Sequence, residues 1–340
     1  MKKLVLFLNK IVFFLNSLAA TMLLLAYVLP YVEPKKFAFL SVLSLSVPFL
    51  IILNILFLIY WLLQVKKQLL LSLIILFVGF IFLSPLYKFS SSKNIEDENN
   101  IKVMNYNVRL FNVFKWIKEE NVDQKIVDFI NEKQPDILSI QEYRRDEDIN
   151  LSGYEKFEVI SGQKVKNGQA IFSKFPIINS GSIEFPNSFN NAIYVDIVKN
   201  KDTIRVYNVH LQSMKIDANA DALKNETSEN LYRRVSKTFT MQQLQAEQFL
   251  EHKNKCPYKM IICGDFNNTA YSYVYKEIKG DLQDTFVEAG NAFGRTYDIR
   301  FFPVRIDFLL VDDAFEVNSF KTFDVVLSDH YPIMAKVKLK

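Results

Sequence analysis

Six short stretches of the sequence carry polar residues that can support acid–base or metal chemistry, and each lies where an apolar, strand-like run stops. They are 105–109, 141–144, 208–211, 263–267, 305–308 and 328–332. Together they supply four carboxylates and two of the chain's three histidines, namely Glu142, Asp265, Asp307, Asp329, His210 and His330. Carboxylate and amide oxygens are hard ligands, so this set favours Mg²⁺ or Mn²⁺, and His and Cys are too few for a zinc site.

The six stretches, in this order and approximate spacing, resemble the endonuclease/exonuclease/phosphatase superfamily of metal-dependent phosphoesterases, and the resemblance spans 101–340. Residues 264–267 (GDFN) and 328–333 (SDHYPI) are its most specific signatures, and 168–176 resembles the family's central strand and following turn. The resemblance implies a deoxyribonuclease I-like α/β fold, a four-layer sandwich of two packed mixed β-sheets flanked by helices. It also implies hydrolysis of phosphoester bonds with Mg²⁺ or Mn²⁺ as cofactor.

The resemblance assigns metal-binding and water-activating roles to matching residues. Glu142 looks like the main metal ligand, with Asn107 and Asp329 close to the ion. Asp265 matches the residue that orients or deprotonates the attacking water. Asn267 lies two residues further on and therefore on the same face of an extended chain, where it would hold the phosphate or support the metal.

The two histidines and two arginines complete the implied site. His330 should contact the phosphate and be held in one tautomer by Asp307, and His210 is a candidate proton donor to the leaving group. Arg109 and Arg144 resemble the deoxyribonuclease I branch, whose matching arginines touch nucleic acid. Each residue also has a structural alternative: turn-capping for a lone Asp or Asn, a surface ion-pair network for Asp307 and Asp329, a satisfied imidazole for His210, and a solvated loop position for Arg144.

Three functions remain open. A nuclease-type phosphodiesterase is favoured by the two arginines, although a domain of net charge −2 lacks the basic stripe typical of nucleic-acid binding. A phosphodiesterase of lipid head groups, similar to the family's sphingomyelinases, is favoured by a membrane tether. A non-catalytic membrane receptor or scaffold would reuse the fold, but would not need to keep every reacting residue. The sequence indicates no protein partner besides the phosphodiester substrate and the bilayer.

The elements that position the site follow from hydrophobic periodicity. Strand-like runs recur, and amphipathic helices are expected around 122–130 and 235–250. This mixture favours two packed sheets with helices outside, in one catalytic domain over 101–340, preceded by a polar linker at 88–100. Cys256 and Cys263 lie too close along one extended strand to pair, so no disulfide is expected.

Residues 1–87 have a different composition, with seven lysines and a single acid, Glu33. Of the chain's 41 basic and 37 acidic residues, 34 and 36 therefore lie in 88–340, which divides the net charge of +4 into +6 and −2. Three uncharged runs at 11–29, 37–63 and 69–86 are each close to the length that crosses a bilayer, so they predict a multi-pass membrane anchor.

A cleaved signal peptide is the alternative for the first run, but the apolar sequence continues without a break to Leu29. Three spans place the two ends of the chain on opposite faces of the membrane. Lysines at positions 2, 3, 10, 66 and 67 favour a cytoplasmic N-terminus. This orientation puts the catalytic domain outside the cytoplasm.

Overall fold

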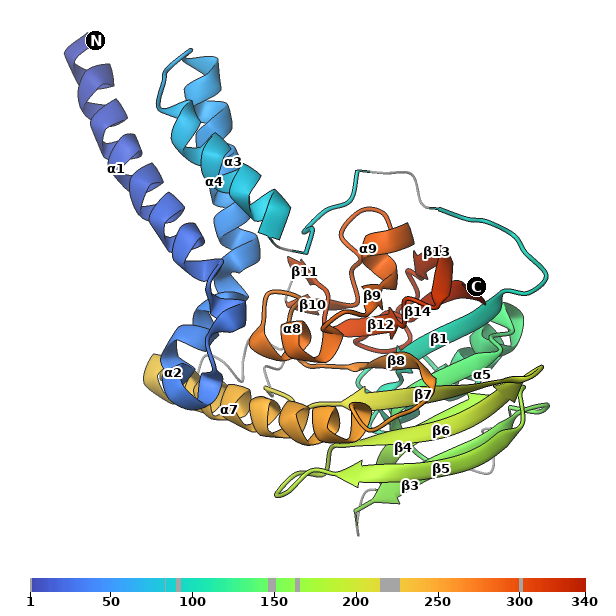
Figure 1. Ribbon diagram of the computed structural model, residues 1–340. Helices are drawn as coiled ribbons and strands as arrows, with labels where there is room; N and C mark the ends of the chain where they lie inside the picture. Colours follow the sequence, from blue (N-terminus) through green and yellow to red (C-terminus); the bar gives the residue numbers. More distant parts are fainter. Residues whose placement is uncertain are drawn as a thin grey trace.

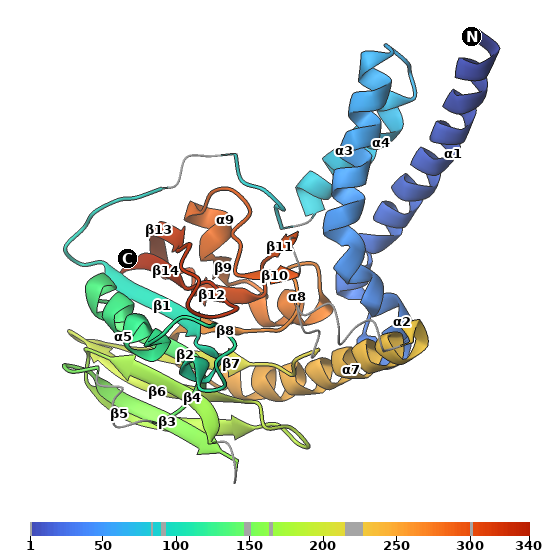
Figure 2. The same ribbon diagram turned by 180° about the vertical axis from the view of Figure 1, so that it is seen from behind.

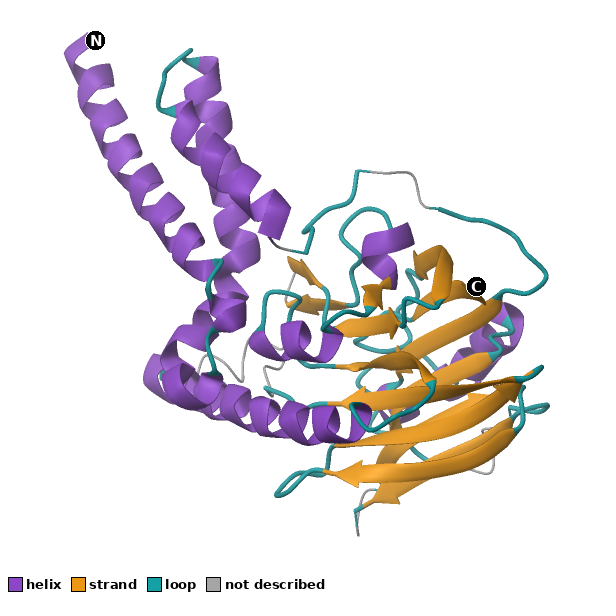
Figure 3. Ribbon diagram, in the orientation of Figure 1, coloured by secondary structure: helices purple, strands orange, loops and turns teal. Residues whose placement is uncertain are grey.

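The computed structural model of the 340-residue chain describes residues 2–82, 84–89, 93–145, 151–162, 166–214, 227–299 and 302–340. A group of N-terminal helices rises from one side of a β-rich body (Figures 1 and 3). The helical elements are α1 (Lys2–Ala26), η1 (Leu29–Tyr31), α2 (Pro34–Ser41), η2 (Val42–Ser46), α3 (Val47–Leu63), α4 (Leu69–Phe82), η3 (Arg109–Asn112), α5 (Val122–Lys133), α7 (Ser228–Lys253), α8 (Tyr273–Lys279) and α9 (Thr285–Ala289).

The described residues form two six-stranded sheets and a short hairpin. The first sheet has the order β13 (Phe315–Thr322), β14 (Ile333–Leu339), β1 (Ile101–Asn107), β2 (Ile137–Tyr143), β4 (Asn167–Ser173), β3 (Glu155–Ser161). The second has the order β5 (Ile177–Glu184), β6 (Asn191–Lys199), β7 (Asp202–His210), β8 (Lys259–Asp265), β12 (Asp307–Val311), β9 (Gln283–Asp284). The hairpin pairs β10 (Tyr297–Ile299) with β11 (Phe302–Val304). Only β1–β2 and β7–β8 pair in parallel among the described strands, so both sheets are mixed.

The two sheets pack face to face, with helices on their outer faces (Figure 2). Alternate residues such as Val103 in β1, Val195 in β6 and Ile261 in β8 form the core between the sheets. The opposite face of the first sheet packs on α5, and the opposite face of the second packs on α7 and α8. Because strand side chains alternate between faces, both faces of each sheet are buried. The predicted four-layer sandwich is confirmed.

The outer helices follow their apolar spacing. In α5, Val122, Ile126, Phe129 and Ile130 recur at helical intervals and are all buried against the first sheet. The helix ends at Lys133 and is capped by Gln134, which adopts a left-handed conformation directly before Pro135. The longer α7 begins at Ser228 and is capped by Thr227, whose hydroxyl accepts a hydrogen bond from the Asn230 amide at 3.3 Å.

The N-terminal helices differ from the expected three spans. Within the described residues, two helical stretches, Lys3–Tyr31 and Pro34–Leu63, are long and apolar enough to cross a membrane. The third, α4, has only 14 residues, about 21 Å at 1.5 Å per residue, which is shorter than the roughly 30 Å of a hydrocarbon core. The described residues thus contain two helical stretches of full spanning length, where three were expected. Residues 83 and 90–92, within the predicted third span and linker, lie outside the described part of the chain.

Polar side chains join α1, α3 and α4 inside the uncharged runs that the sequence indicated. Asn16 donates to Ser72 Oγ at 2.7 Å, and Trp61 Nε1 donates to Asn16 Oδ1 at 2.9 Å. Ser72 in turn donates to Asn54 Oδ1 at 3.3 Å. All four residues are buried, and hydrogen bonds of this kind fix how apolar helices associate.

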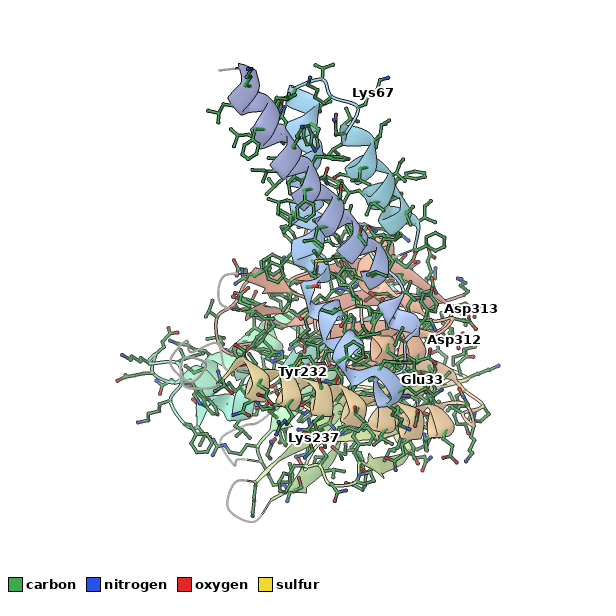
Figure 4. The ribbon with its side chains drawn as sticks, turned by 90° about the vertical axis from the view of Figure 1, so that its left-hand side faces the viewer. Glu33, Lys67, Tyr232, Lys237, Asp312 and Asp313 are labelled. Atoms are coloured by element: carbon green, nitrogen blue, oxygen red, sulfur yellow. The ribbon has the colours of Figure 1, made fainter. Side chains whose placement is uncertain are left out.

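The base of the helix group packs on the β-rich body. The backbone amide of Lys35 donates to Gln243 of α7 at 2.8 Å, and the Lys35 ammonium pairs with Glu247. Figure 4 shows Glu33 at this end, beside α7, and Lys67 at the far end of the helices. Residues 88 and 94 also form β-bridges, to Ala292 and Ser319 respectively. These contacts hold the helices and the linker against the domain.

Candidate active site

Strand register brings the predicted residues from distant parts of the sequence to one edge of the sandwich. Asn107 ends β1, and Glu142 lies near the end of its parallel neighbour β2. In the second sheet His210 ends β7 and is paired with Asp265 at the end of β8. Asp265 is also paired with Asp307, the first residue of β12. The site therefore forms where the carboxyl ends of four strands meet.

Asp265, His330 and Asp307 form a buried charged cluster. His330 Nδ1 lies 2.9 Å from Asp307 Oδ2, and His330 Nε2 lies 3.7 Å from Asp265 Oδ2. Burial alone would lower the pKa of His330, but the carboxylates of Asp307 and Asp265 outweigh it and raise that pKa well above the usual range. This shift favours the imidazolium form of His330, in which both ring nitrogens are donors.

Asp265 has the environment of a general base. Burial raises its pKa to about 7, against the opposing effect of the His330 imidazolium. Its Oδ1 accepts a hydrogen bond from the Asn267 amide at 2.8 Å, and its Oδ2 accepts one from Asn107 Nδ2 at 3.1 Å. These bonds fix the carboxylate in place while leaving it able to take up a proton near neutral pH.

Asn107, Glu142 and Asp329 offer oxygen ligands next to this cluster. Asn107 Nδ2 donates to Glu142 Oε1 at 3.4 Å, and Asn107 Oδ1 accepts from the Arg109 amide at 3.1 Å. Burial and the nearby Asp329 carboxylate both raise the pKa of Glu142. Two carboxylates that repel each other in a sheltered site, with an amide beside them, form a donor set that fits a hard divalent cation.

Asp265, Asp307 and His330 form a second group of possible ligands, whose ligand atoms all lie within 4.8 Å of one another. We favour the Glu142 group as the metal site, because the His330 imidazolium already supplies positive charge between the two aspartates. A protonated imidazole has no free lone pair for a metal.

Asn267 lines the cavity on the side of the second sheet, whereas the buried His210 is not among the described residues that line it. Asn267 Nδ2 donates to the Leu211 carbonyl at 3.0 Å, which ties the loop after β8 to the end of β7. His210 Nε2 lies 3.8 Å from Asp265 Oδ2 and has no hydrogen-bond partner among the described residues. Burial, followed by repulsion from His330, lowers the pKa of His210 to about 3. The ring is therefore neutral at pH 7 and can donate a hydrogen bond without carrying an extra proton.

The two arginines have different positions. Arg109 Nη1 pairs with Asp329 Oδ2 at 3.0 Å, and its guanidinium lies 4.4 Å from the centre of the Trp116 ring. Arg109 lines the cavity above the site, whereas Arg144, two residues beyond Glu142, is not among the described residues that line it. The structure thus brings Arg109 to the site and leaves Arg144 outside the cavity.

Three of these residues have left-handed backbone conformations, with φ of 43° at Arg109, 49° at Glu142 and 50° at Asn267. At Glu142 the register between β2 and β4 shifts by one residue, which forms a bulge. Such conformations cost of order 1–3 kcal/mol each in residues other than glycine, so they persist where the surrounding structure imposes them. Their concentration around one cavity favours a functional site over a set of unrelated turns.

The cavity has a volume of about 370 Å³. Glu142, Asp265, Asn267, Asp329 and His330 form its polar floor. Most of the remaining lining is apolar or aromatic and did not emerge from the sequence: Trp116, Ser213, Met214, Tyr297, Ile299, Val304 and Ile306. The Tyr297 ring lies 5.0 Å from the His330 ring, so the β10–β11 hairpin forms one wall. Short, half-buried strands such as β10 give almost no periodic signal, which is why this wall was missed.

Buried amides connect the two sheets behind the site. Gln141 Nε2 donates to Asn208 Oδ1 at 2.6 Å and to Asn105 Oδ1 at 2.7 Å. Asn208 Nδ2 donates to the Ile140 carbonyl at 2.9 Å. Gln141 is adjacent to Glu142 and Asn208 is two residues before His210, so this network fixes the separation of the two strand ends. In the sequence, this network could have been recognised from the polar residues Asn105, Gln141 and Asn208 inside otherwise apolar, strand-like runs.

Comparison with known proteins agrees with this geometry. Residues 104–330, two thirds of the chain, match the model of the endonuclease/exonuclease/phosphatase family. The chain belongs to this family. The endonuclease/exonuclease/phosphatase family consists of metal-dependent enzymes, and this protein is accordingly a hydrolase acting on phosphoester bonds. Residues 9–86 match a separate model described as a domain of unknown function (DUF8431). No curated protein sequence matches the chain.

Solved structures with the same fold have low sequence identity. An endonuclease/exonuclease/phosphatase from Bacteroides vulgatus is 17% identical, with a TM-score of 0.55 over 72% of this chain and 100% of that one. The human Nocturnin catalytic domain, with bound sulfate, is 19% identical, with a TM-score of 0.53 over 71% of this chain and 94% of that one. D. rerio TDP2, in complex with a single-strand DNA product, is 14% identical, with a TM-score of 0.53 over 71% and 100%. At these identities the likeness shows the fold alone.

Proposed function

We propose that the protein is a membrane-anchored phosphodiesterase that requires a divalent metal ion, Mg²⁺ or Mn²⁺. The observation that carries this proposal is the position of Asp265, with a pKa of about 7, beside the His330 imidazolium and within hydrogen-bond distance of Asn107. A base, a cation and a group of oxygen ligands around one 370 Å³ cavity are the parts that phosphodiester hydrolysis needs.

In this mechanism the Asp265 carboxylate accepts a proton from a water molecule, and the water oxygen forms a bond to phosphorus as the bond to the leaving oxygen breaks. The His330 imidazolium, oriented by Asp307, donates through Nε2 to a phosphoryl oxygen and offsets its growing charge. Neutral His210 donates a hydrogen bond to the phosphate or the leaving oxygen, and Asn267 positions the phosphate.

Glu142, Asn107 and Asp329 are the proposed metal ligands. A bound Mg²⁺ or Mn²⁺ would polarise a phosphoryl oxygen and neutralise charge on the phosphate. The amide of Asn107 presents Nδ2 to Glu142 and Asp265, and its Oδ1 accepts from the Arg109 amide. Asn107 would therefore have to turn to offer its oxygen to a bound ion.

For the substrate we propose a nuclease-type activity first, because Arg109 lies at the cavity and its fork suits phosphate oxygens. A lipid head-group phosphodiester is the second candidate, and the apolar wall formed by Met214, Ile299 and Val304 favours it. A non-catalytic receptor is less consistent with a base poised near neutral pH. We retain Arg144 only as a peripheral contact for a long substrate.

We further propose that the protein is integral to the membrane and crosses it three times, with α4 as a short third span. Ser72 of α4 is buried against Asn16 of α1, so the three helices form one group. Because Lys67 lies at the end of the helices away from the domain (Figure 4), the N-terminus and the domain would lie on opposite sides, with the catalytic domain outside the cytoplasm.

The test uses the full-length protein in detergent with bis-p-nitrophenyl phosphate. We expect turnover with Mg²⁺ or Mn²⁺, loss of turnover with a chelator, and recovery when the metal is restored. His330→Ala should abolish turnover, whereas the matched His252→Ala should not, because His252 lies against Tyr207 away from the cavity. Equal turnover in the two histidine variants would contradict the proposal. Plasmid DNA and phospholipid vesicles offered side by side then separate the two substrate classes.

A further inference from the structure

An exposed aromatic cluster lies directly after the last N-terminal helix. The Tyr87 ring is 4.7 Å from the Phe89 ring and 4.9 Å from the Phe293 ring. Phe89 is 93% exposed, which is costly in water for a side chain of this size. Tyr87 is five residues beyond Phe82, the last residue of α4, so it lies within about 18 Å of that helix end, even along a fully extended chain.

A large groove continues from this cluster over the domain surface. It has a volume of about 1070 Å³ and lies between the β10–β11 hairpin and β13. Phe293 and Pro303 line the groove and also a small cavity that Pro48 of α3 and Pro85 border. One end of the groove is therefore continuous with the base of α3 and α4.

The lining of the groove carries more basic than acidic side chains. Its charged residues are Lys93, Lys133, Arg295, Lys321, Lys336, Asp298 and Asp324. Arg295 pairs with Asp298, and Lys93, Lys133 and Lys336 pair with acidic residues that are not part of the lining, Glu316, Glu132 and Glu96 respectively. Lys321 has no ion pair among the described residues; it is exposed and lies 5.1 Å from the centre of the Phe323 ring. Lys321 is therefore the cation of this groove that is most available to an anionic group.

The contacts at the base of the helices fix which way this face points. Phe49 of α3 lies 4.2 Å, ring to ring, from Phe302 of the hairpin. Arg305 Nη2 donates to Ser84 Oγ at 2.9 Å, and the Lys276 ammonium lies 4.7 Å from the Tyr31 ring centre. Because these contacts lie on both sides of the helix group, they oppose rotation of the domain about its connection to α4. In Figures 1 and 2, α9, the hairpin and the linker lie on the side of the domain towards which the N-terminal helices extend.

We propose that this face rests on the bilayer in which the helices sit, with Tyr87, Phe89 and Phe293 at the interface and anionic lipid head groups in the groove beside Lys321. Aromatic side chains concentrate at membrane interfaces, and lysine and arginine clusters beside spans attract anionic lipids. A single-stranded nucleic acid also binds aromatic and basic surfaces. The position of the cluster, within a few residues of the end of α4, favours the lipid.

The test measures how deeply a nitroxide label at residue 89 enters the bilayer. Phe89→Cys is labelled in a Cys256→Ser background, where the remaining Cys263 is fully buried. The full-length protein is placed in nanodiscs of phosphatidylcholine, with or without phosphatidylglycerol. We compare the label's accessibility to oxygen, which enters the bilayer, with that to a water-soluble nickel complex. The matched control is Phe189→Cys, an 82% exposed phenylalanine. It belongs to the connection between β5 and β6, strands that lie on the side of the domain away from the linker (Figure 1).

We expect the ratio of oxygen to nickel accessibility to be several-fold higher at residue 89 than at residue 189, and to rise further with phosphatidylglycerol. Equal ratios at the two positions would overturn the proposal. Lys321→Glu should remove most of the rise caused by phosphatidylglycerol, whereas Lys237→Glu, on exposed α7, should not. A rise that is the same in both lysine variants, or no rise, would exclude lipid binding in the groove.

Two further arms keep the interpretation clear. In the first, a single-stranded oligonucleotide is added to the protein in phosphatidylcholine discs. If the oligonucleotide lowers the accessibility of the residue 89 label and phosphatidylglycerol does not change it, the surface is assigned to nucleic acid instead. Hydrolysis of bis-p-nitrophenyl phosphate is measured for each labelled variant to check its fold. If the unmodified protein has no such activity, the proposed function fails, while the membrane contact is still decided by the labels.

Discussion

His330 donates through Nδ1 to Asp307 Oδ2 at 2.9 Å, and this bond determines that Nε2 is the nitrogen that faces Asp265 and the cavity. Both residues are buried, so the pair is little screened by water. A histidine held by a carboxylate on one side is oriented and electrostatically tuned at the same time. The reactivity proposed for His330 therefore depends on a residue that does not line the cavity.

Replacement of Asp307 tests this dependence. In Asp307→Asn the carboxylate that raises the pKa of His330 is gone, so the imidazolium should lose its proton at a lower pH. We expect kcat to fall about 100-fold or more, the cost of losing one charge-stabilising donor. The alkaline limb of the pH–rate profile should also move to lower pH. Asp313→Asn, in the exposed turn between β12 and β13, is the control, and an unchanged alkaline limb in Asp307→Asn would contradict the assignment.

The pH dependence of the unmodified enzyme follows from the two raised pKa values. Asp265 acts as a base only when deprotonated, and burial raises its pKa to about 7, so activity should increase as pH rises from 5 towards 7. His330 acts only when protonated, and its raised pKa keeps it so until more alkaline pH. A bell-shaped profile of kcat/KM at saturating metal is expected. A profile that is flat between pH 5 and 7 would be incompatible with Asp265 as the base.

Glu142 is expected to control the metal requirement. In Glu142→Gln one of the proposed ligands loses its charge, so the Mg²⁺ concentration that gives half-maximal activity should increase by about 10-fold or more. Titration of the chelated protein with Mg²⁺ measures this. Glu98→Gln, in the exposed segment before β1, should titrate like the unmodified protein. An identical midpoint for Glu142→Gln would remove Glu142 from the metal site.

A stability prediction concerns the buried pair of Arg205 and Asp196, away from the active site. Arg205 Nε and Nη2 donate to the Asp196 carboxylate at 2.6 and 2.7 Å. Arg205→Met leaves the Asp196 carboxylate buried without its positively charged partner, with only the Asn179 side-chain amide donating to it at 2.9 Å, which should cost about 3–5 kcal/mol. Lys259→Met breaks the half-exposed pair with Asp202 at 3.0 Å and should cost less than about 1 kcal/mol. Thermal unfolding of the full-length protein in detergent compares the two, and similar midpoints would contradict the expectation.

The predictions from sequence were most successful where a polar residue able to act in catalysis lies next to an apolar, strand-like run. Each of the strands β1, β2, β7, β8 and β12 combines an apolar run with a polar residue at its end, so both the strand and the site residue were recognisable. Parallel or antiparallel pairing at Asn107, His210, Asp265 and Asp307 then brings those ends together. The roles proposed for these residues towards a metal ion and a phosphate came from the family resemblance.

The remainder depends on tertiary packing that no local pattern specifies. The edge strands β3 and β5 are half exposed, and their sequences lack a clear apolar face. Tyr297 becomes a cavity residue only because the hairpin folds over His330. Likewise, the three apolar runs did not indicate that α4 stops at Phe82, or that Asn16 and Ser72 meet inside the helix group.

The most direct test of the account compares turnover of bis-p-nitrophenyl phosphate by full-length Asp265→Asn and Asp202→Asn in saturating Mg²⁺. The amide introduced by Asp265→Asn keeps the size of the side chain but cannot accept the proton of water, so the account expects a loss of at least about 100-fold. The half-exposed Asp202, in β7 of the same sheet, should be dispensable. Full turnover in Asp265→Asn, with a chelator-sensitive rate equal to that of Asp202→Asn, would contradict it.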